Sequence, residues 1–465
     1  MNTPVDPLDS LALGIAGLAD AYRQQHLSPV ETVGSLLDRI EADTRGVNAF
    51  CHIDRTGALA AAHASEQRHC AGQPLGPLDG VPVSIKDLSD VAGWPTRRGS
   101  LSTSPDPATQ DAPAVALLRA AGAVIFGKTT TTEFGWTIAS ENPYSGLTRN
   151  PHDTSRTAGG SSSGAAAQIA MGWGRLALGS DAGGSVRIPA SFCGVVGFKP
   201  TFGAIPLAPQ SAFGEFAHLG PITRNVDDCI AAMAVLSQAD TRDPSSLFPR
   251  NLSSLALDAE RPLRIGWSTR LAGAVPIDGA IADAFSGMLA RLQAVGHNLE
   301  EVALEPGDAA CHMWQVWCSR VFESFQFWPA SRRAQLDPRL QQVYEAGAAQ
   351  DGPTLAMSRQ RLREFGTRLA LAFSQIDVLL TPATPTVAPR NAGLTADGAM
   401  AGGNWFAANG FAWPFNLGQQ PALSLPLGRD PEGLPFGLQV AGRRYQDHQV
   451  LAFGRQLERL IGAAA

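Results

Sequence analysis

The amino-acid sequence predicts an α/β protein whose functional loops lie beyond the ends of buried strands. Three observations support this fold class. The chain has 465 residues, of which 44% are hydrophobic and 17% charged, so it is long enough to bury one large core or two ordinary ones. Its 48 glycines and 33 prolines interrupt the hydrophobic segments, as tight turns between elements do. Strand-like and helix-like segments alternate along much of the chain.

The first elements carry clear local signals. Ser28, Pro29 and Glu31 form a capping-box sequence, which predicts the start of a helix. Residues 81–86 alternate between strongly apolar and less apolar side chains, so we expect a strand that places Lys86 near its end, on the less apolar face. A helix over 112–122, a strand over 123–128 and a loop over 133–150 follow.

Later segments continue the pattern. We expect a buried helix over 165–172, a short strand over 175–181 and a turn over 182–194 that enters another element. From about Ala239 the chain becomes rich in Asp, Pro and Ser, which marks a candidate boundary for a peripheral portion. Beyond it we expect strands over 263–267, 376–389, 421–428 and 437–442, and helices over 281–296 and 448–462.

Composition excludes several classes of function. The net charge is -6 and no run of Lys or Arg is present, which argues against direct nucleic-acid binding. The six cysteines form no CxxC pair and the histidines no HxxxH pair, so we expect reduced thiols and no metal. Asp6 and Asp9 stand where a secretory signal would be positive, and the charge-free stretch 398–428 is interrupted by Gly, Pro and Asn. We therefore expect a cytoplasmic protein that does not enter a membrane.

Residues 156–172 read RTAGGSSSGAAAQIAMG and admit four interpretations. A flexible linker fits poorly, because an uncharged helix-like segment follows. A phosphate-binding loop would need a Walker lysine or GxGxxG, and neither is present. Residues 160–164 match G-x-S-x-G with Ser162 as nucleophile, but such a turn follows a strand, and the preceding residues are polar and turn-like.

The fourth interpretation joins this stretch to two distant residues. Ser185 follows Ser161 by 24 residues and lies in a second Gly/Ser turn. Lys86 precedes Ser161 by 75 residues. A serine hydroxyl needs a base to become a nucleophile, and a lysine can serve when burial keeps it neutral. A second serine between them can relay the proton.

Three blocks resemble the amidase signature family, in the order and spacing of that family. They are GPLDGVPVSIKD at 76–87, GGSSSGAAA at 159–167 and LGSDAGGSVRIPASFCGVVGFKPT at 178–201. Looser similarity covers nearly the whole chain. The resemblance implies a single large domain with a central mixed β-sheet covered by helices on both faces. It also implies a hydrolase that cleaves a carboxylic amide through a serine acyl-enzyme, without a cofactor.

The resemblance also assigns roles to individual residues. Ser185 would be the nucleophile, Ser161 a bridging serine next to a cis peptide bond, and Lys86 the base. The oxyanion hole would consist of backbone N–H groups of Ala182, Gly183, Gly184 and Ser185. Supporting roles would fall to Ser162, Asp181 and Arg187.

The substrate is expected to be a small-molecule amide with hydrophobic or aryl character. Aromatic residues concentrate in segments outside the three blocks, and five residues are predicted to line the pocket: Gly135, Trp136, Trp314, Trp317 and Trp405. Two alternatives remain open. The chain could be the A subunit of a glutamyl-tRNA amidotransferase, which releases ammonia from glutamine, or a non-catalytic binder with the same fold. Dimers are common among relatives, so a homodimer is one expected assembly.

Within the single domain we expect four portions. Residues 1–70 would form a helical segment on the core, and 71–238 the core that carries the catalytic residues. Residues 239–390 would be peripheral and form the substrate pocket, and 391–465 would return to the core as strands and a helix.

Overall fold

One large mixed sheet organises the part of the chain that the structure describes. This computed structural model describes residues 13–247, 262–271, 273, 275–391 and 405–463; Asp6, Asp9 and residues 248–254 of the Asp/Pro/Ser-rich segment lie outside these ranges. Eleven strands hydrogen-bond in the order β1 (Phe50–Ile53), β3 (Val124–Thr129), β2 (Pro82–Lys86), β6 (Leu176–Asp181), β8 (His218–Thr223), β7 (Val196–Lys199), β12 (Ala422–Arg429), β13 (Pro435–Gly442), β11 (Val378–Pro382), β9 (Arg264–Trp267) and β10 (Asn298–Glu301).

The three blocks map to neighbouring strands of this sheet and to the start of α6. Strands β3, β2 and β6 are parallel neighbours, and β8 returns antiparallel beside β6. Parallel neighbours bring the ends of β2 and β6 to the same edge of the sheet. Lys86 is the last residue of β2 and Asp181 the last residue of β6, so this edge carries residues of two of the three blocks.

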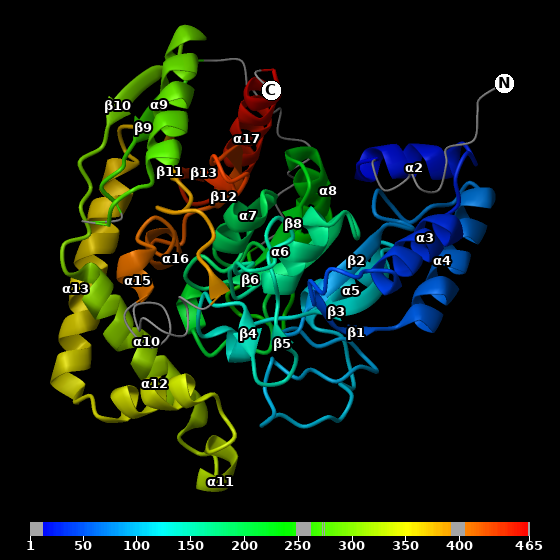
Figure 1. The fold of residues 1–465 in the computed structure, drawn as a ribbon, viewed down its shortest axis with the longest axis horizontal. Coiled ribbons are helices and arrows are strands. Elements are labelled where there is room, and N and C mark those ends of the chain that lie inside the picture. Colours follow the sequence, from blue (N-terminus) through cyan, green and yellow to red (C-terminus); the bar gives the residue numbers. More distant parts are fainter. Residues whose placement is uncertain (1–12, 248–261, 272, 274, 392–404, 464–465) are drawn as a thin grey trace.

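Helices cover both faces of the sheet, as expected (Figure 1). One face packs against α5 (Pro113–Ala120), α8 (Val226–Leu236), α9 (Gly279–Ala294) and α17 (Asp447–Gly462). The other face packs against α3 (Pro29–Glu41), α4 (Arg55–Cys70), α6 (Ser163–Ala170) and α7 (Arg187–Cys193). Beyond α7 the same side continues with α10 (Ala309–Phe325), α12 (Pro338–Ala348), α13 (Gly352–Ala372), α15 (Trp405–Ala408) and α16 (Pro414–Leu417). Helix α2 (Ile15–Arg23) packs beside α8 and α4, and the short α11 (Ala330–Arg333) precedes α12.

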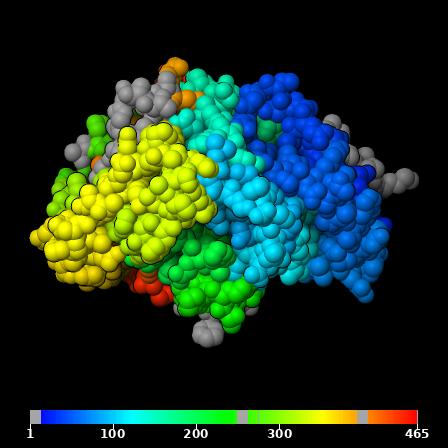
Figure 2. All heavy atoms as spheres, turned by 90° about the horizontal axis from the view of Figure 1, so that it is seen from below, coloured from blue at the N-terminus to red at the C-terminus, as the bar shows by residue number. Residues whose placement is uncertain are grey.

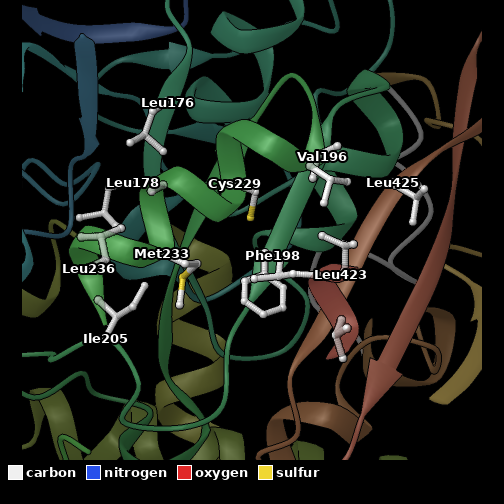
Figure 3. Packing of buried hydrophobic residues seen from close by; sticks show 14 of the residues in the cluster. Leu176, Leu178, Val196, Phe198, Ile205, Cys229, Met233, Leu236, Leu423 and Leu425 are labelled. Atoms are coloured by element: carbon white, nitrogen blue, oxygen red, sulfur yellow. The ribbon is translucent and has the colours of Figure 1, made fainter. Parts of the chain in front are cut away.

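The alternation within β2 separates two environments. Val83 and Ile85 enter the apolar core beneath α5 and α8, the core that Figure 3 shows around Leu178, Phe198 and Met233. Successive side chains of a strand point to opposite faces. Lys86 therefore points toward the face that carries α6, where the Gly/Ser stretch begins a helix. The prediction that Lys86 ends a strand on its less apolar face is confirmed.

Most predicted elements are present, with two differences. The capping box at Ser28 forms, with its side chain accepting from Glu31 N–H and the Glu31 carboxylate accepting from Ser28 N–H. The predicted loop 133–150 contains a 3-10 turn, η1 (Glu133–Gly135), and a two-stranded hairpin, β4 (Glu141–Asn142) and β5 (Gly146–Leu147). The portion 239–390 is not only peripheral, because β9, β10 and β11 complete one edge of the main sheet.

The helices of 309–372 form a layer at one end of the molecule. Figure 2 shows this layer, coloured yellow-green to yellow, against the cyan segment that follows β2. One contact between them is a hydrogen bond from Arg332 Nε to the carbonyl of Ser102, at 3.0 Å. The layer thus reaches the loop that follows β2.

Candidate active site

Lys86 forms the centre of a buried cluster of hydroxyl groups. Its Nζ lies 2.7 Å from Ser161 Oγ, 2.9 Å from Ser162 Oγ and 3.0 Å from Ser180 Oγ. The side chain is 1% exposed, and burial lowers its pKa well below 10.5, with partial opposition from the charge of Asp181. No carboxylate within hydrogen-bond distance of Lys86 occurs among the described residues. The environment therefore favours a neutral amine, which can accept a proton.

The Gly/Ser stretch places Ser161 beside Lys86. The Gly160–Ser161 peptide bond is cis, as the resemblance implies. Position 160 requires glycine because the Ala139 carbonyl oxygen lies so close that a Cβ there would overlap it. Ser162, the residue that G-x-S-x-G would make the nucleophile, instead donates from Oγ to the Ser180 carbonyl at 3.1 Å and accepts from Lys86. Its backbone N–H donates to the Ser185 carbonyl at 3.1 Å, which ties the two serine segments together.

Asp181 braces the turn that carries Ser185. Its carboxylate accepts from the N–H groups of Gly184 at 2.7 Å and Val186 at 3.1 Å, and pairs with Arg187 at 2.9 Å. Asn416 donates to the same carboxylate at 2.8 Å. Burial alone would raise the pKa of Asp181, but the Arg187 guanidinium outweighs it and holds the pKa well below its usual range. The ionised carboxylate of Asp181, paired with Arg187, therefore holds this turn in place through its backbone N–H groups.

The predicted oxyanion hole needs one correction. The N–H of Gly184 is already donated to Asp181, so it is not available to a substrate oxygen. Within the described ranges, the N–H groups of Ala182, Gly183 and Ser185 have no protein acceptor. The turn therefore offers three of the four expected donors.

Ser161 and Ser185 face the same cavity, which has a volume of about 90 Å³. Gly135, one of the predicted pocket residues, lies in its wall. Apolar side chains make up much of the rest, and Arg98 is the one basic residue among the described residues of the wall. The described lining consists of Leu88, Ser89, Arg98, Phe134, Gly135, Ser161, Ser180, Asp181, Ala182, Ser185, Leu207, Pro209, Gln210, Ser211, Ala212, Phe213, Ala217 and Leu219.

The four predicted pocket tryptophans lie behind this wall rather than on it. Trp317 stacks on Phe213 with ring centroids 3.7 Å apart and donates from Nε1 to the Trp136 carbonyl at 3.1 Å. Trp405 stacks on Phe406, and Trp314 contacts the edge of the same ring. All described lining residues fall between positions 88 and 219, so the expectation that 239–390 forms the pocket is also wrong for this cavity. The tryptophans instead support the wall from the outside.

Trp405 has a particular position in this supporting layer. A Cβ added to Gly183 would lie 2.7 Å from its Cη2 atom and 3.0 Å from the Phe406 ring. The aromatic layer, formed by Trp405 and Phe406, therefore packs closely against the turn that carries Gly183.

Three groups that sequence reasoning missed also shape the site. Ser180 contacts Lys86 through both its hydroxyl and its carbonyl. Asp87, directly after Lys86, forms a buried ion pair with Lys128 at 2.8 Å. Glu133 is 1% exposed, and burial raises its pKa from 4.5 to about 7. The adjacency of Asp87 to Lys86 was visible in the sequence, but its partner is 41 positions away and belongs to a different strand.

Comparison with known proteins decides the family. A family model described as Amidase matches residues 31–451. The chain belongs to the amidase family. The Acylamidase of Rhodococcus erythropolis is 32% identical over 458 residues, covering 96% of this chain and 95% of that protein. The A subunit of the glutamyl-tRNA(Gln) amidotransferase of Akkermansia muciniphila is 32% identical, covering 95% of this chain and 97% of that protein.

A solved amidase structure agrees with these sequence matches. It is described as a bacterial aryl acylamidase of the amidase signature family, with a TM-score of 0.87, 28% identity and 96% of each chain covered. The single domain and mixed sheet expected for an amidase are thereby confirmed. Relatives that hydrolyse amides support the same reaction for this amidase.

No set of three or more His, Cys, Asp or Glu residues in the described part of the amidase is arranged to hold a metal ion. All six cysteines are free thiols. No helix in the described ranges has both the length and the hydropathy to cross a bilayer.

Proposed function

We propose that this amidase cleaves a carboxylic amide to an acid and an amine or ammonia, with Ser185 as nucleophile, Ser161 as proton relay and Lys86 as base. The observation that carries the proposal is the buried contact of 2.7 Å between Lys86 Nζ and Ser161 Oγ, on the wall of the cavity that Ser185 faces. Burial keeps the lysine ready to accept a proton, which an exposed lysine would not do near neutral pH.

The first half of the reaction forms the acyl-enzyme. Lys86 takes the Ser161 hydroxyl proton while Ser161 takes that of Ser185, and Ser185 Oγ attacks the amide carbonyl carbon. The relay requires the Ser185 hydroxyl to donate a hydrogen bond to Ser161 Oγ. The negative oxygen of the tetrahedral intermediate accepts from the N–H groups of Ala182, Gly183 and Ser185. Removing one such donor typically costs about 2.7–4 kcal/mol of transition-state stabilisation.

The second half releases both products. The protonated Lys86 returns a proton through Ser161 to the leaving nitrogen, the C–N bond breaks and the amine departs. Water then attacks the ester of Ser185, with the same relay removing its proton, and the carboxylic acid leaves with the serine hydroxyl restored. Lys86 ends the cycle neutral, so no cofactor is consumed.

The cavity supports a substrate with a short acyl group. Its volume of about 90 Å³ is smaller than the roughly 150 Å³ of a protein cavity that binds benzene. Apolar wall residues such as Leu207, Phe213 and Leu219 favour an aliphatic group over a charged one. Similarity to an acylamidase and an aryl acylamidase favours an aromatic group on the amine side. We therefore expect short-chain anilides to be better substrates than benzamides.

A substrate panel tests this proposal together with one variant. Amine or ammonia release should be faster from acetanilide than from benzamide, and Ser185→Ala should abolish both. Retention of full activity in Ser185→Ala would refute the assigned nucleophile. Ammonia release from glutamine, and no release from anilides, would favour the amidotransferase alternative that the second relative represents. Failure of a fluorophosphonate to label Ser185 would favour a non-catalytic binder.

A further inference from the structure

Glu133 is a buried carboxylate that the relay does not use. It begins the 3-10 turn η1, and the next two residues, Phe134 and Gly135, line the catalytic cavity. A Cβ placed on Gly135 would lie 3.3 Å from Ser161 Oγ, so the backbone of η1 passes directly beside the relay serine. The position of η1 therefore bears on the alignment of Ser161.

A chain of hydrogen-bond donors ends on the Glu133 carboxylate. Oε1 accepts from the Ser100 hydroxyl at 2.5 Å, and Oε2 accepts from the Asp337 N–H at 2.7 Å. Ser100 Oγ in turn accepts from the Ser102 N–H at 3.1 Å and contacts the Ser102 hydroxyl at 2.6 Å. Both carboxylate oxygens thus face donors. An ionised carboxylate accepts at both oxygens and a neutral one still accepts from the Asp337 N–H, whereas an amide that accepts there must present its own N–H to the Ser100 hydroxyl and reverse that hydrogen bond.

The same carboxylate joins three segments of the chain. Ser100 belongs to the loop whose Arg98 carbonyl accepts from Phe134 N–H at 2.8 Å. Asp337 caps α12, and its side chain pairs with Arg339, which also pairs with Glu141 at 2.5 Å. The charged groups that act on Glu133 are Asp337 and Arg339 of α12. Glu133 therefore connects the layer of 309–372, visible in Figure 2, to the wall of the cavity.

We propose that Glu133 is a positioning residue for amide hydrolysis, whose carboxylate holds Phe134 and Gly135 against Ser161 so that this serine stays aligned between Lys86 and Ser185. The inference rests on the proposed relay and adds a group that acts through η1 without contacting the substrate. Its effect is on the rate of serine activation rather than on substrate binding.

The test compares Glu133→Gln with Glu141→Gln. Glu133→Gln places an amide N–H against Ser100 or Asp337. Glu141→Gln is the matched control, because it removes a charged partner of Arg339 in the same network and leaves both hydrogen bonds of Glu133 intact. We expect Glu133→Gln to lower kcat about tenfold, as loss of a hydrogen bond to a charged group would, with KM changed less than about twofold. The rate of Ser185 labelling by a fluorophosphonate should fall by the same factor. Glu141→Gln should match the wild type in both measurements.

Three outcomes overturn the inference. Wild-type kcat and labelling rate in Glu133→Gln would show that the carboxylate positions nothing, and an equal loss in Glu141→Gln would show a general effect of the layer. If Glu133→Gln does not fold, Ser100→Ala removes one donor and keeps the carboxylate, and wild-type rates in that variant would refute the inference. If the wild-type protein neither hydrolyses amides nor reacts with the fluorophosphonate, the proposed function itself is refuted. That measurement needs no variant, so the two failures are distinguishable.

Discussion

The contact between Gly183 and the aromatic layer predicts a large effect from a very small substitution. Gly183 lies in the oxyanion turn, and an alanine Cβ there would stand 2.7 Å from Trp405 Cη2, whereas ordinary contact begins near 3.4 Å. Trp405 is 1% exposed and stacked on Phe406, so it has little room to retreat. The difference between the two distances, 0.7 Å, must therefore be taken up largely by the turn.

The expected loss follows from the sensitivity of catalysis to position. A misplacement of about 1 Å costs about 10²-fold in rate, so a shift of 0.7 Å predicts a loss of kcat between about 10- and 100-fold in Gly183→Ala. KM should change much less, because the oxyanion donors bind the transition state more strongly than the ground state. Steady-state kinetics with an anilide measures both constants.

A double variant separates this steric effect from a general requirement for glycine. Trp405→Phe shortens the ring that meets the new methyl group, so the double variant should recover at least about fivefold of the lost kcat relative to Gly183→Ala. The φ angle of Gly183 is not in the left-handed region, so alanine meets no left-handed backbone strain there. Wild-type kcat in Gly183→Ala, or a double variant no better than the single one, would refute the reasoning.

Two further predictions concern pH. Because burial lowers the pKa of Lys86 and the relay needs its neutral form, kcat/KM should rise with pH through that pKa and stay high above it, and Lys86→Arg should be inactive at every pH. Burial raises the pKa of Glu133 from 4.5 to about 7, so the stability from this group is present below about pH 4.5 and is lost as the pH rises to 7. Glu133→Gln lacks the titrating group and so avoids this loss. The unfolding free energy of the variant minus that of the wild type should therefore increase by about 2.5 kcal/mol from about pH 5 to about pH 8, as measured by guanidinium denaturation. The exposed Glu300→Gln should show no such gain, and a gain equal in both variants would contradict the assignment.

Local patterns accounted for much of the fold. The capping box predicted the start of α3, because its hydrogen bonds join residues three positions apart. Alternation placed Lys86 at the end of β2, because one face of that strand enters an apolar core. Strand β8 was not predicted, and β1 and β10 were missed because each has four residues and little alternation. Their conformation depends on pairing with β3 and β9, which are distant in sequence or separated by a helix.

The reactive residues of the candidate site could be predicted from the sequence. The residues that hold them in position could not. Lys86, Ser161 and Ser185 could be named because the resemblance fixes their blocks. Trp317 and Trp405 were predicted to line the pocket; both are buried, but an aromatic residue in a sequence does not say which surface its ring will face. The partners of Glu133 are 33 and 204 positions away, so no spacing rule could connect them. Such supports depend on tertiary packing that a single sequence does not encode as a local pattern.

Comparison of two buried lysines explains how the fold selects its base. Lys86 and Lys128 lie near the same end of the parallel strands β2 and β3, and Lys128 is adjacent in register to Ile85, so it points to the opposite face from Lys86. Lys128 meets the Asp87 carboxylate at 2.8 Å, whereas Lys86 meets hydroxyls and one carbonyl. The carboxylate that acts on Lys86 from a distance, Asp181, is held by Arg187 and Asn416. Burial lowers the pKa of Lys86, and no carboxylate among the described residues lies close enough to Lys86 to reverse that effect by direct pairing, which suits Lys86 to remove a proton.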